Sequence, residues 1–451
     1  TKGNGYKPYA REMNFVTERV SNNNSFNPNA LYLEWKKEKE KYRNSKQSSA
    51  ANWVSMGPIN TPIILSNGKK RGNGRVNCIA FDPFDADIIW VGSPAGGLWK
   101  SVDGGGNWTT NTDDLPVIGV SHIAIDPNNN QIMYIVTGDA YATDTYSIGI
   151  LKSIDGGSTW NPTGLSYTVN QEKTVNKVIV NPNFTDSLYA VTNLNILISA
   201  DAGTTWQTVG ALGRWRDIEF KPDNANIIYA AKQSSGGSEI YRSTDGGTSW
   251  SSINNGISGS RYRPLIAVTP ENPEIIYALF SASDYSFHGL YKSSDAGDNW
   301  VLQSNTPNIL GRDTDGTSTG GQSWYDLSLG VATDNENLVY VGGINLWRSD
   351  NSGVNWSIDA SSGNGNYSYM HVDQHALEFN PHTHVAYAGN DGGLYKYMDN
   401  LNTWVDISDG LEISQFYNLG LSKSNANRLV AGAQDNGTEM LTNTTWDAVR
   451  G

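Results

Sequence analysis

Short runs of alternating apolar and polar residues recur along most of the chain, with a repeat of about 40–50 residues. Each repeat opens with an apolar run that ends in an Asp-Pro-like turn, as in residues 123–127. A β-branched and aromatic run follows, as in residues 132–135, and a third run such as residues 289–292 leads into a polar turn. A tryptophan opens the fourth run. The pattern predicts antiparallel strands, four to a unit, which is the composition of a β-propeller blade.

The polar turn carries a signature, Ser-x-Asp-x-Gly-x-x-Trp, that marks the repeats. Glycine permits the positive φ of a tight hairpin, and the Ser and Asp side chains can bond the backbone amides of the turn. The tryptophan can bury a large face between neighbouring blades. We therefore interpret the signature as a structural hairpin rather than a ligand site. The copies begin at Ser101, Ser153, Ser199, Ser243, Ser293 and Ser349, with a decayed copy at Tyr397 and a lone tryptophan at Trp446.

These signatures are similar to the Asp boxes (BNR repeats) of sialidase- and sortilin-type propellers, a resemblance that covers residues 53–451. It implies an all-β, multi-bladed β-propeller with eight four-stranded repeats, over residues 51–451. Trp53 resembles a fourth strand, yet the eighth repeat supplies its own at Trp446. We therefore expect further blades beyond residue 451, one of them completed by Trp53; the alternative is an eight-bladed ring with a spare strand.

Residues 1–50 differ from the repeats. A proline followed by alternating Lys and Glu predicts one exposed helix within residues 28–46, which we interpret as a structural strap rather than a partner-binding helix. The chain carries 45 acidic against 32 basic residues, a net charge of −13, which argues against nucleic acid as a partner. The single cysteine, Cys78, lies in an apolar run and is expected in the core. No run of apolar residues is long enough for a membrane helix.

Candidate chemistry concentrates on loops at the face opposite the signature hairpins, where loops converge around the channel of a propeller. His371, Asp373 and His375 have i, i+2, i+4 spacing, which in an extended segment places all three on one side. Three interpretations stay open for them: a metal site, a catalytic or ligand-contacting group, and a structural hydrogen-bond cluster. The last is the one we favour, and we predict no metal and no cofactor.

Aromatic residues beside carboxylates and amides suit sugar rings, which stack on one face and hydrogen-bond through their hydroxyls. Glycoside hydrolysis needs two carboxylates spaced across a groove. The candidates for such a pair are Asp139, Asp373, Asp391 and Asp435. The candidate ligand-binding residues on the same face are Tyr146, Arg214, Trp215, Arg261, Tyr262, Trp324, Tyr325, His371, His375, Asn390 and Gln434.

Several segments, among them residues 72–77, 371–376, 389–393 and 434–437, resemble large secreted sortilin-domain (VPS10-like) proteins of bacteria with type 9 secretion. More distantly the chain is similar to xyloglucanase-type glycoside hydrolases. These resemblances imply a secreted or cell-surface protein that meets secretion machinery. We expect a propeller that binds a glycan or a protein through its channel face. The alternative is a glycoside hydrolase acting on a polysaccharide with two of the four aspartates.

Overall fold

The computed structural model describes residues 30–44, 55–64, 69–142, 145–235, 237–425 and 427–450. Within these residues the chain is almost entirely β-structure, as the alternating pattern predicts. The described helices are α2 (Ala30–Asn44), inside the predicted range, and a single turn of 3-10 helix, η1 (Val169–Gln171). None of the described helices is long and apolar enough to cross a membrane.

Eight sheets follow one another along the chain, one for each predicted repeat. The first four are β2 (Cys78–Phe81), β3 (Ile89–Ser93), β4 (Gly97–Ser101) and β5 (Thr109–Thr110); β6 (Val120–Ile125), β7 (Met133–Thr137), β8 (Gly149–Ser153) and β9 (Asn161–Ser166); β10 (Val175–Val180), β11 (Leu188–Thr192), β12 (Ile196–Ser199) and β13 (Gln207–Val209); β14 (Arg214–Lys221), β15 (Asn224–Gln233), β16 (Glu239–Ser243) and β17 (Ser251–Ser252).

The next three sheets are β18 (Pro264–Val268), β19 (Ile276–Ser281), β20 (Phe287–Ser293) and β21 (Val301–Ser304); β22 (Ser328–Val331), β23 (Val339–Gly342), β24 (Leu346–Ser349), β25 (Ser357–Ser361) and the short parallel β26 (Ser368–Tyr369); β27 (Gln374–Phe379), β28 (Ala386–Asn390), β29 (Gly393–Met398) and β30 (Thr403–Asp406). The eighth contains β31 (Phe416–Leu421), β32 (Arg428–Ala433), β33 (Gly437–Thr442) and β34 (Thr445–Arg450), with β1 (Ile63–Ile64) added parallel to β34.

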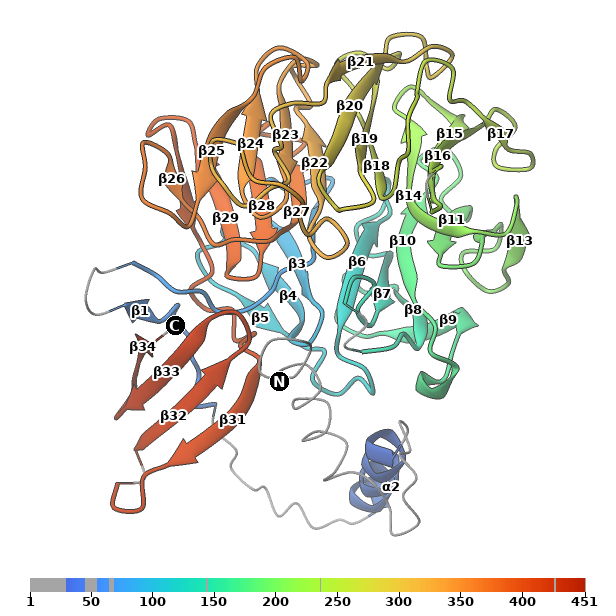
Figure 1. Ribbon diagram of the computed structural model, residues 1–451. Helices are drawn as coiled ribbons and strands as arrows, with labels where there is room; N and C mark the ends of the chain where they lie inside the picture. Colours follow the sequence, from blue (N-terminus) through green and yellow to red (C-terminus); the bar gives the residue numbers. More distant parts are fainter. Residues whose placement is uncertain are drawn as a thin grey trace.

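Seven of these sheets close into a ring. Their first strands pack in the order β2, β6, β10, β14, β18, β22 and β27, and β27 packs back on β2 (Figure 1). Hydrogen bonds reinforce this closure, because Asn380 Nδ2 donates to Ala86 O at 2.9 Å and His382 Nε2 lies 2.9 Å from Asp82 O. We expected all eight repeats in one ring or a larger one. The ring closes after seven, and the eighth sheet lies outside it.

The eighth sheet is held by the segment that precedes the ring. Ile63 pairs with Asp447, and Trp446 Nε1 donates to Met56 O at 2.5 Å. Trp53, which we expected to complete a blade, lies outside the described residues. On β31 the apolar side chains of Leu419 and Leu421 are 60% and 73% exposed, unlike the first strands of the ring.

The signature hairpins form as predicted. Ser153 Oγ donates to Asp155 Oδ1 at 2.8 Å and accepts from Gly157 N at 2.9 Å, which closes the turn. Hydrogen bonds from Thr159 are the main reason that the pKa of Asp155 falls to about 2, although this carboxylate is exposed. Tryptophans join neighbouring sheets, as where Trp108 Nε1 donates to Ile407 O at 3.1 Å. The acidic residues of the signatures therefore accept hydrogen bonds from their own turns.

Replacing Ser153 by alanine is expected to lower the free energy of unfolding by about 1–2 kcal/mol, because the buried amide of Gly157 loses its acceptor. Ser158→Ala is the matched control, since Ser158 is exposed and only donates to the backbone oxygen of Asp155. Urea denaturation followed by tryptophan fluorescence measures both. Equal effects of the two substitutions would contradict a structural role for the signature serine.

Glu439 on β33 predicts a pH-dependent stability. It is fully buried, neither carboxylate oxygen has a hydrogen-bond partner among the described residues, and burial raises its pKa to about 8, against a lowering by Arg71. The folded state thus holds a proton that the unfolded state releases above its ordinary pKa of 4.5. Keeping this proton in the folded state lowers the free energy of unfolding. The loss is absent below pH 4.5 and grows toward pH 8, reaching about 3 kcal/mol at pH 7.

Glu439→Gln is accordingly expected to raise the melting temperature at pH 7–8 and to leave it unchanged near pH 4. Thermal melts of the substituted and parent chains at both pH values measure the difference. A stabilisation of the same size at both pH values would show that ionisation of Glu439 is not its cause.

Candidate functional site

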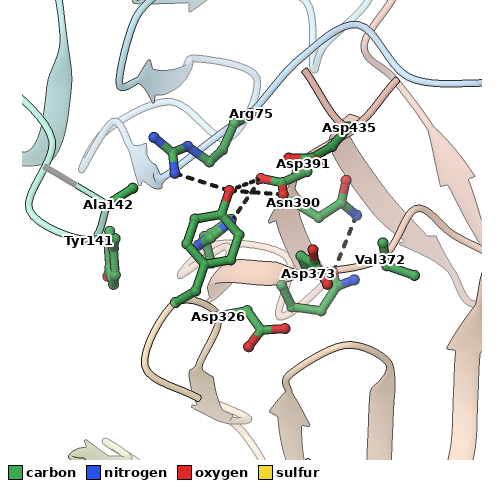
Figure 2. A network of polar contacts seen from close by, with 12 residues as sticks. Arg75, Tyr141, Ala142, Asp326, Val372, Asp373, Asn390, Asp391 and Asp435 are labelled. Carbon is green, nitrogen blue, oxygen red and sulfur yellow. Dashed lines mark hydrogen bonds and ion pairs between the residues drawn. The ribbon is translucent and has the colours of Figure 1, made fainter. Parts of the chain in front are cut away.

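Polar side chains from several sheets of the ring meet where the loops between second and third strands approach the segments that precede the first strands. Asp139 follows β7 and Asp391 follows β28, whereas Arg75, Tyr325 and Asp373 precede β2, β22 and β27. The antiparallel meander brings both kinds of segment to the same end of every blade, so residues far apart in sequence converge (Figure 2).

A buried hydrogen-bond network occupies the centre of this cluster. Arg75 Nη2 lies 2.6 Å from Asp139 Oδ2, and Arg75 Nη1 donates to Tyr325 OH at 3.1 Å. The Tyr325 hydroxyl lies 2.9 Å from Asp391 Oδ2, and His375 Nε2 lies 2.9 Å from Asp391 Oδ1. The side chains of Arg75 and Asp139 are 3% and 0% exposed, so this is an internal ion pair.

Burial sets the protonation of this network. It raises the pKa of Asp391 to about 7, with Arg75 opposing and Asp435 adding to the rise. Burial likewise pushes the pKa of His375 well below its ordinary value, with the charge of Arg75 acting in the same direction. The imidazole of His375 is therefore neutral, and its Nε2 is hydrogen-bonded to Asp391 Oδ1.

Asp373 forms a second carboxylate pair beside this network. Gln322 Nε2 donates both to Asp326 Oδ2, at 3.0 Å, and to Asp373 Oδ1, which holds the two carboxyl groups together. Burial, and then the charges of Asp391 and Asp435, raise the pKa of Asp373 to about 7. Burial and the charge of Asp373 raise the pKa of Asp326 well above its usual range. Asp373 remains partly exposed, whereas Asp326 is 1% exposed.

Asp435 comes to the cluster from outside the ring, on the turn between β32 and β33 (Figure 2). Its carboxylate is exposed and accepts a hydrogen bond from Gln434. Asn436 Nδ2 donates to Asp391 O at 3.0 Å and so anchors this turn against the ring. Asp373 and Asp435 both have positive φ, 68° and 54°, a strained conformation for a residue with a side chain.

The other predicted site residues divide by exposure. Trp215 is fully buried in a hydrophobic core cluster, with its indole nitrogen 3.1 Å from Ala211 O. The structure likewise buries His371, His375 and Asn390. Trp324 is 50% exposed. The predicted residues that stay at least partly exposed are Tyr146, Arg214, Arg261, Tyr262, Trp324, Tyr325 and Gln434.

The alternation expected of residues 371–375 is not formed. β27 begins only at Gln374, the positive φ of Asp373 breaks the extended segment, and the register shifts after Gln374. His371 Nδ1 instead lies 3.1 Å from Val372 O, while His375 meets Asp391. Among the described residues no group of three or more His, Cys, Asp or Glu could hold a metal ion.

Sequence reasoning did not single out Arg75, Gln322 or Asp326 as site residues. Arg75 and Asp326 occupy the same place as Asp373, just before a first strand, and this shared position is the signal that could have found them. Gln322 carries no such signal, because its side chain reaches the cluster from within a long loop.

Comparison with known proteins supports the same type of fold. No protein-family model matches the chain. A xyloglucanase of Paenibacillus is 24% identical over 328 residues, covering 63% of this chain and 31% of the relative, and one of Hypocrea jecorina is 23% identical over 349 residues, covering 75% and 33%. The chain therefore spans about a third of the length of these relatives.

Solved structures agree with this picture. The GH74 enzyme of Niastella koreensis superposes with a TM-score of 0.63 at 18% identity, covering 87% of this chain and 61% of that one. The GH74 xyloglucanase of Xanthomonas campestris gives 0.62 at 17% identity, covering 80% and 58%. The propeller fold is thus of the kind seen in xyloglucanases. Type 9 secretion and a sortilin-type relationship stay predictions.

Proposed function

We propose that this chain is part of a secreted glycoside hydrolase that acts on a xyloglucan-like polysaccharide, with Asp373 as general acid and Asp435 as its partner carboxylate. The observation that carries the proposal is the difference between these two groups. Asp373 is partly buried with a pKa of about 7, and Asp435 is exposed and contributes to that raised pKa. An acid and a base in one site need different environments, so that one carboxyl group keeps its proton while the other is ionised.

The other two candidate aspartates are less suited to chemistry. Asp139 is fixed to Arg75, and Asp391 accepts from Tyr325 and His375. Both are at most 2% exposed, so neither carboxylate can reach a glycosidic oxygen. The charge of Asp391 instead raises the pKa of Asp373, which makes Asp391 a positioning residue, and Asp139 holds Arg75 in place.

Trp324 supplies a surface for a sugar ring beside this pair. It is half exposed and lies on the loop whose Gln322 binds Asp373. The Tyr325 ring lies 5.5 Å from that of Trp324, which supports the indole from within the network. Sugar rings stack on such aromatic faces through their C–H groups while their hydroxyls bond nearby polar groups.

In the proposed reaction, Asp373 donates its proton to the glycosidic oxygen as the bond to the anomeric carbon breaks. The pair of electrons of that bond passes to the departing oxygen, and Asp435 either activates water or attacks the anomeric carbon itself. Water supplies the new hydroxyl in either case, so the products are two sugar chains. The curated xyloglucanase relatives favour xyloglucan as the substrate.

Release of reducing ends from xyloglucan tests the proposal, with a β-1,4-glucan that lacks xylose branches as the matched polysaccharide. We expect turnover of xyloglucan by the parent chain and loss of at least 10³-fold in Asp435→Asn. Binding of xyloglucan without any turnover, equal in parent and variant, would overturn hydrolysis. That result would instead favour a propeller that binds glycans without hydrolysing them, which is the function that the channel-face loops first indicated.

A further inference from the structure

Asp326 lies next to the proposed acid, Asp373, on its buried side. A turn over residues 322–326 places Gln322 beside Asp326, because Asp326 N donates to Gln322 O at 3.3 Å. The side-chain nitrogen of Gln322 donates to Asp326 Oδ2 at 3.0 Å and also to Asp373 Oδ1. Each of the two hydrogens of this amide is thus used on one carboxyl group, and the two carboxyl groups lie close together (Figure 2).

The second oxygen of Asp326 has no such donor. Asp326 is 1% exposed, and its Oδ1 is buried without receiving a hydrogen bond from any residue that the structure describes. An ionised Asp326 would therefore be a buried charge with a single hydrogen bond, next to another carboxyl group, which is costly. A protonated carboxyl group is itself a donor, and Asp373 is an acceptor. These contacts favour a proton on Asp326.

The charges around the pair favour the same state. Burial, and then the charge of Asp373, raise the pKa of Asp326 well above its usual range, whereas the charge of Arg263 opposes the rise. Burial, and then the charges of Asp391 and Asp435, raise the pKa of Asp373 to about 7. A hydrogen bond from Asp326 lowers it, which is the effect of a donor. Two neighbouring carboxyl groups that lose one proton hold the other more tightly.

We propose that Asp326 keeps one proton throughout the reaction and donates it in a hydrogen bond to Asp373. The inference rests on the proposed role of Asp373 as general acid. Asp373 gives its own proton to the glycosidic oxygen, and the hydrogen bond from Asp326 stabilises the negative charge that is left behind. The water consumed in hydrolysis returns a proton to the site. Asp326 neither gains nor loses a proton and does not contact the substrate, so it is a positioning residue.

Two substitutions of Asp326 test this role through the pH dependence of xyloglucan turnover. An asparagine amide donates like a protonated carboxyl group, so Asp326→Asn should keep kcat within about three-fold and keep the alkaline limb near pH 7. Leucine is of similar size but has no donor, so Asp326→Leu should lower kcat by about ten-fold or more. The asparagine variant carries the test if the leucine variant does not fold.

The opposite results would overturn the proposal. If Asp326 were ionised, Asp326→Asn would remove a negative charge beside Asp373 and move the alkaline limb to lower pH. Parent-like turnover of Asp326→Leu would show that no hydrogen bond from this position is needed. A structural role alone would lower the melting temperature of the variants without moving the limb.

Infrared spectroscopy tests the retained proton without substrate. At pH 9 carboxyl groups with a pKa of about 7 or 8, such as Asp373 and Glu439, are mostly ionised. Asp326 should still give the C=O stretch of a protonated carboxyl group, and Asp326→Asn should remove that band. Asp155→Asn is the control and should leave the spectrum in this region unchanged, because Asp155 has a pKa of about 2.

The two measurements separate this inference from the hydrolase proposal. An unchanged band in Asp326→Asn overturns the inference whether or not the chain hydrolyses xyloglucan. Loss of the band in a chain that does not hydrolyse xyloglucan supports the proton on Asp326, and the proposed function alone fails.

Discussion

Replacing Asp373 by asparagine is expected to lower kcat on xyloglucan by at least 10³-fold while leaving binding of the polysaccharide nearly unchanged. The substitution keeps the size of the side chain and the hydrogen bond from Gln322, and it removes the proton that the leaving oxygen needs. In the parent chain kcat/KM should fall as pH rises through about 7, because only protonated Asp373 can act as the acid. Any residual activity of the variant should lack that alkaline limb.

Asp391→Asn is the control for this assignment. Asp391 raises the pKa of Asp373, after burial the largest cause, but is itself too buried to contact substrate. Its replacement should therefore move the alkaline limb to lower pH and retain turnover under acidic conditions. If Asp391→Asn removed activity at every pH while Asp373→Asn kept the parent profile, the acid would be Asp391. Rates between pH 4 and pH 9 on one substrate distinguish the two.

The blades could be predicted from sequence because each is a local structure. The signature at residues 153–160 closes its own hairpin, and the alternation of the adjoining runs fixes which side chains enter the core. The number of blades in the ring is a different matter. Closure depends on contacts between the first and seventh sheets, such as Asn380 with Ala86, which no local pattern encodes. Counting signatures therefore gave eight sheets but could not assign the eighth to its place outside the ring.

In the candidate site, too, the local features could be predicted and the contacts between sheets could not. Its loops could be located because a propeller brings them to one face, and Asp373, Asp391 and Asp435 do gather there. Which carboxylate is accessible could not be predicted. That property depends on partners contributed by other sheets, above all Arg75 and Gln322, and on the break in extended structure at Asp373. The burial of Trp215, predicted as a ligand contact, could not be foreseen for a related reason: the register of its strand shifts between Trp215 and Asp217, and Trp215 is fully buried whereas Arg216 stays partly exposed.

The ion pair between Arg75 and Asp139 carries the second large expected effect. Asp139→Ala is expected to lower the free energy of unfolding by about 3–5 kcal/mol, because a guanidinium that is 3% exposed loses the buried carboxylate that lies 2.6 Å from its Nη2. Asp223→Ala is the matched control. The pair of Asp223 with Lys221 has the same 2.6 Å separation, but that carboxylate is 53% exposed, so the loss should stay below about 1 kcal/mol.

Urea unfolding of both variants measures the contrast, and a double replacement, Arg75→Met with Asp139→Leu, shows its origin. If the cost comes from an uncompensated buried charge, removing both charges should recover most of the stability. If instead the pair holds the first and second sheets together by its geometry, the double variant should be at least as unstable as Asp139→Ala. Because the charge of Arg75 also opposes the rise in the pKa of Asp391, the double variant should at the same time move the alkaline limit of activity. Stability and catalysis would then be linked through one arginine at the centre of the ring.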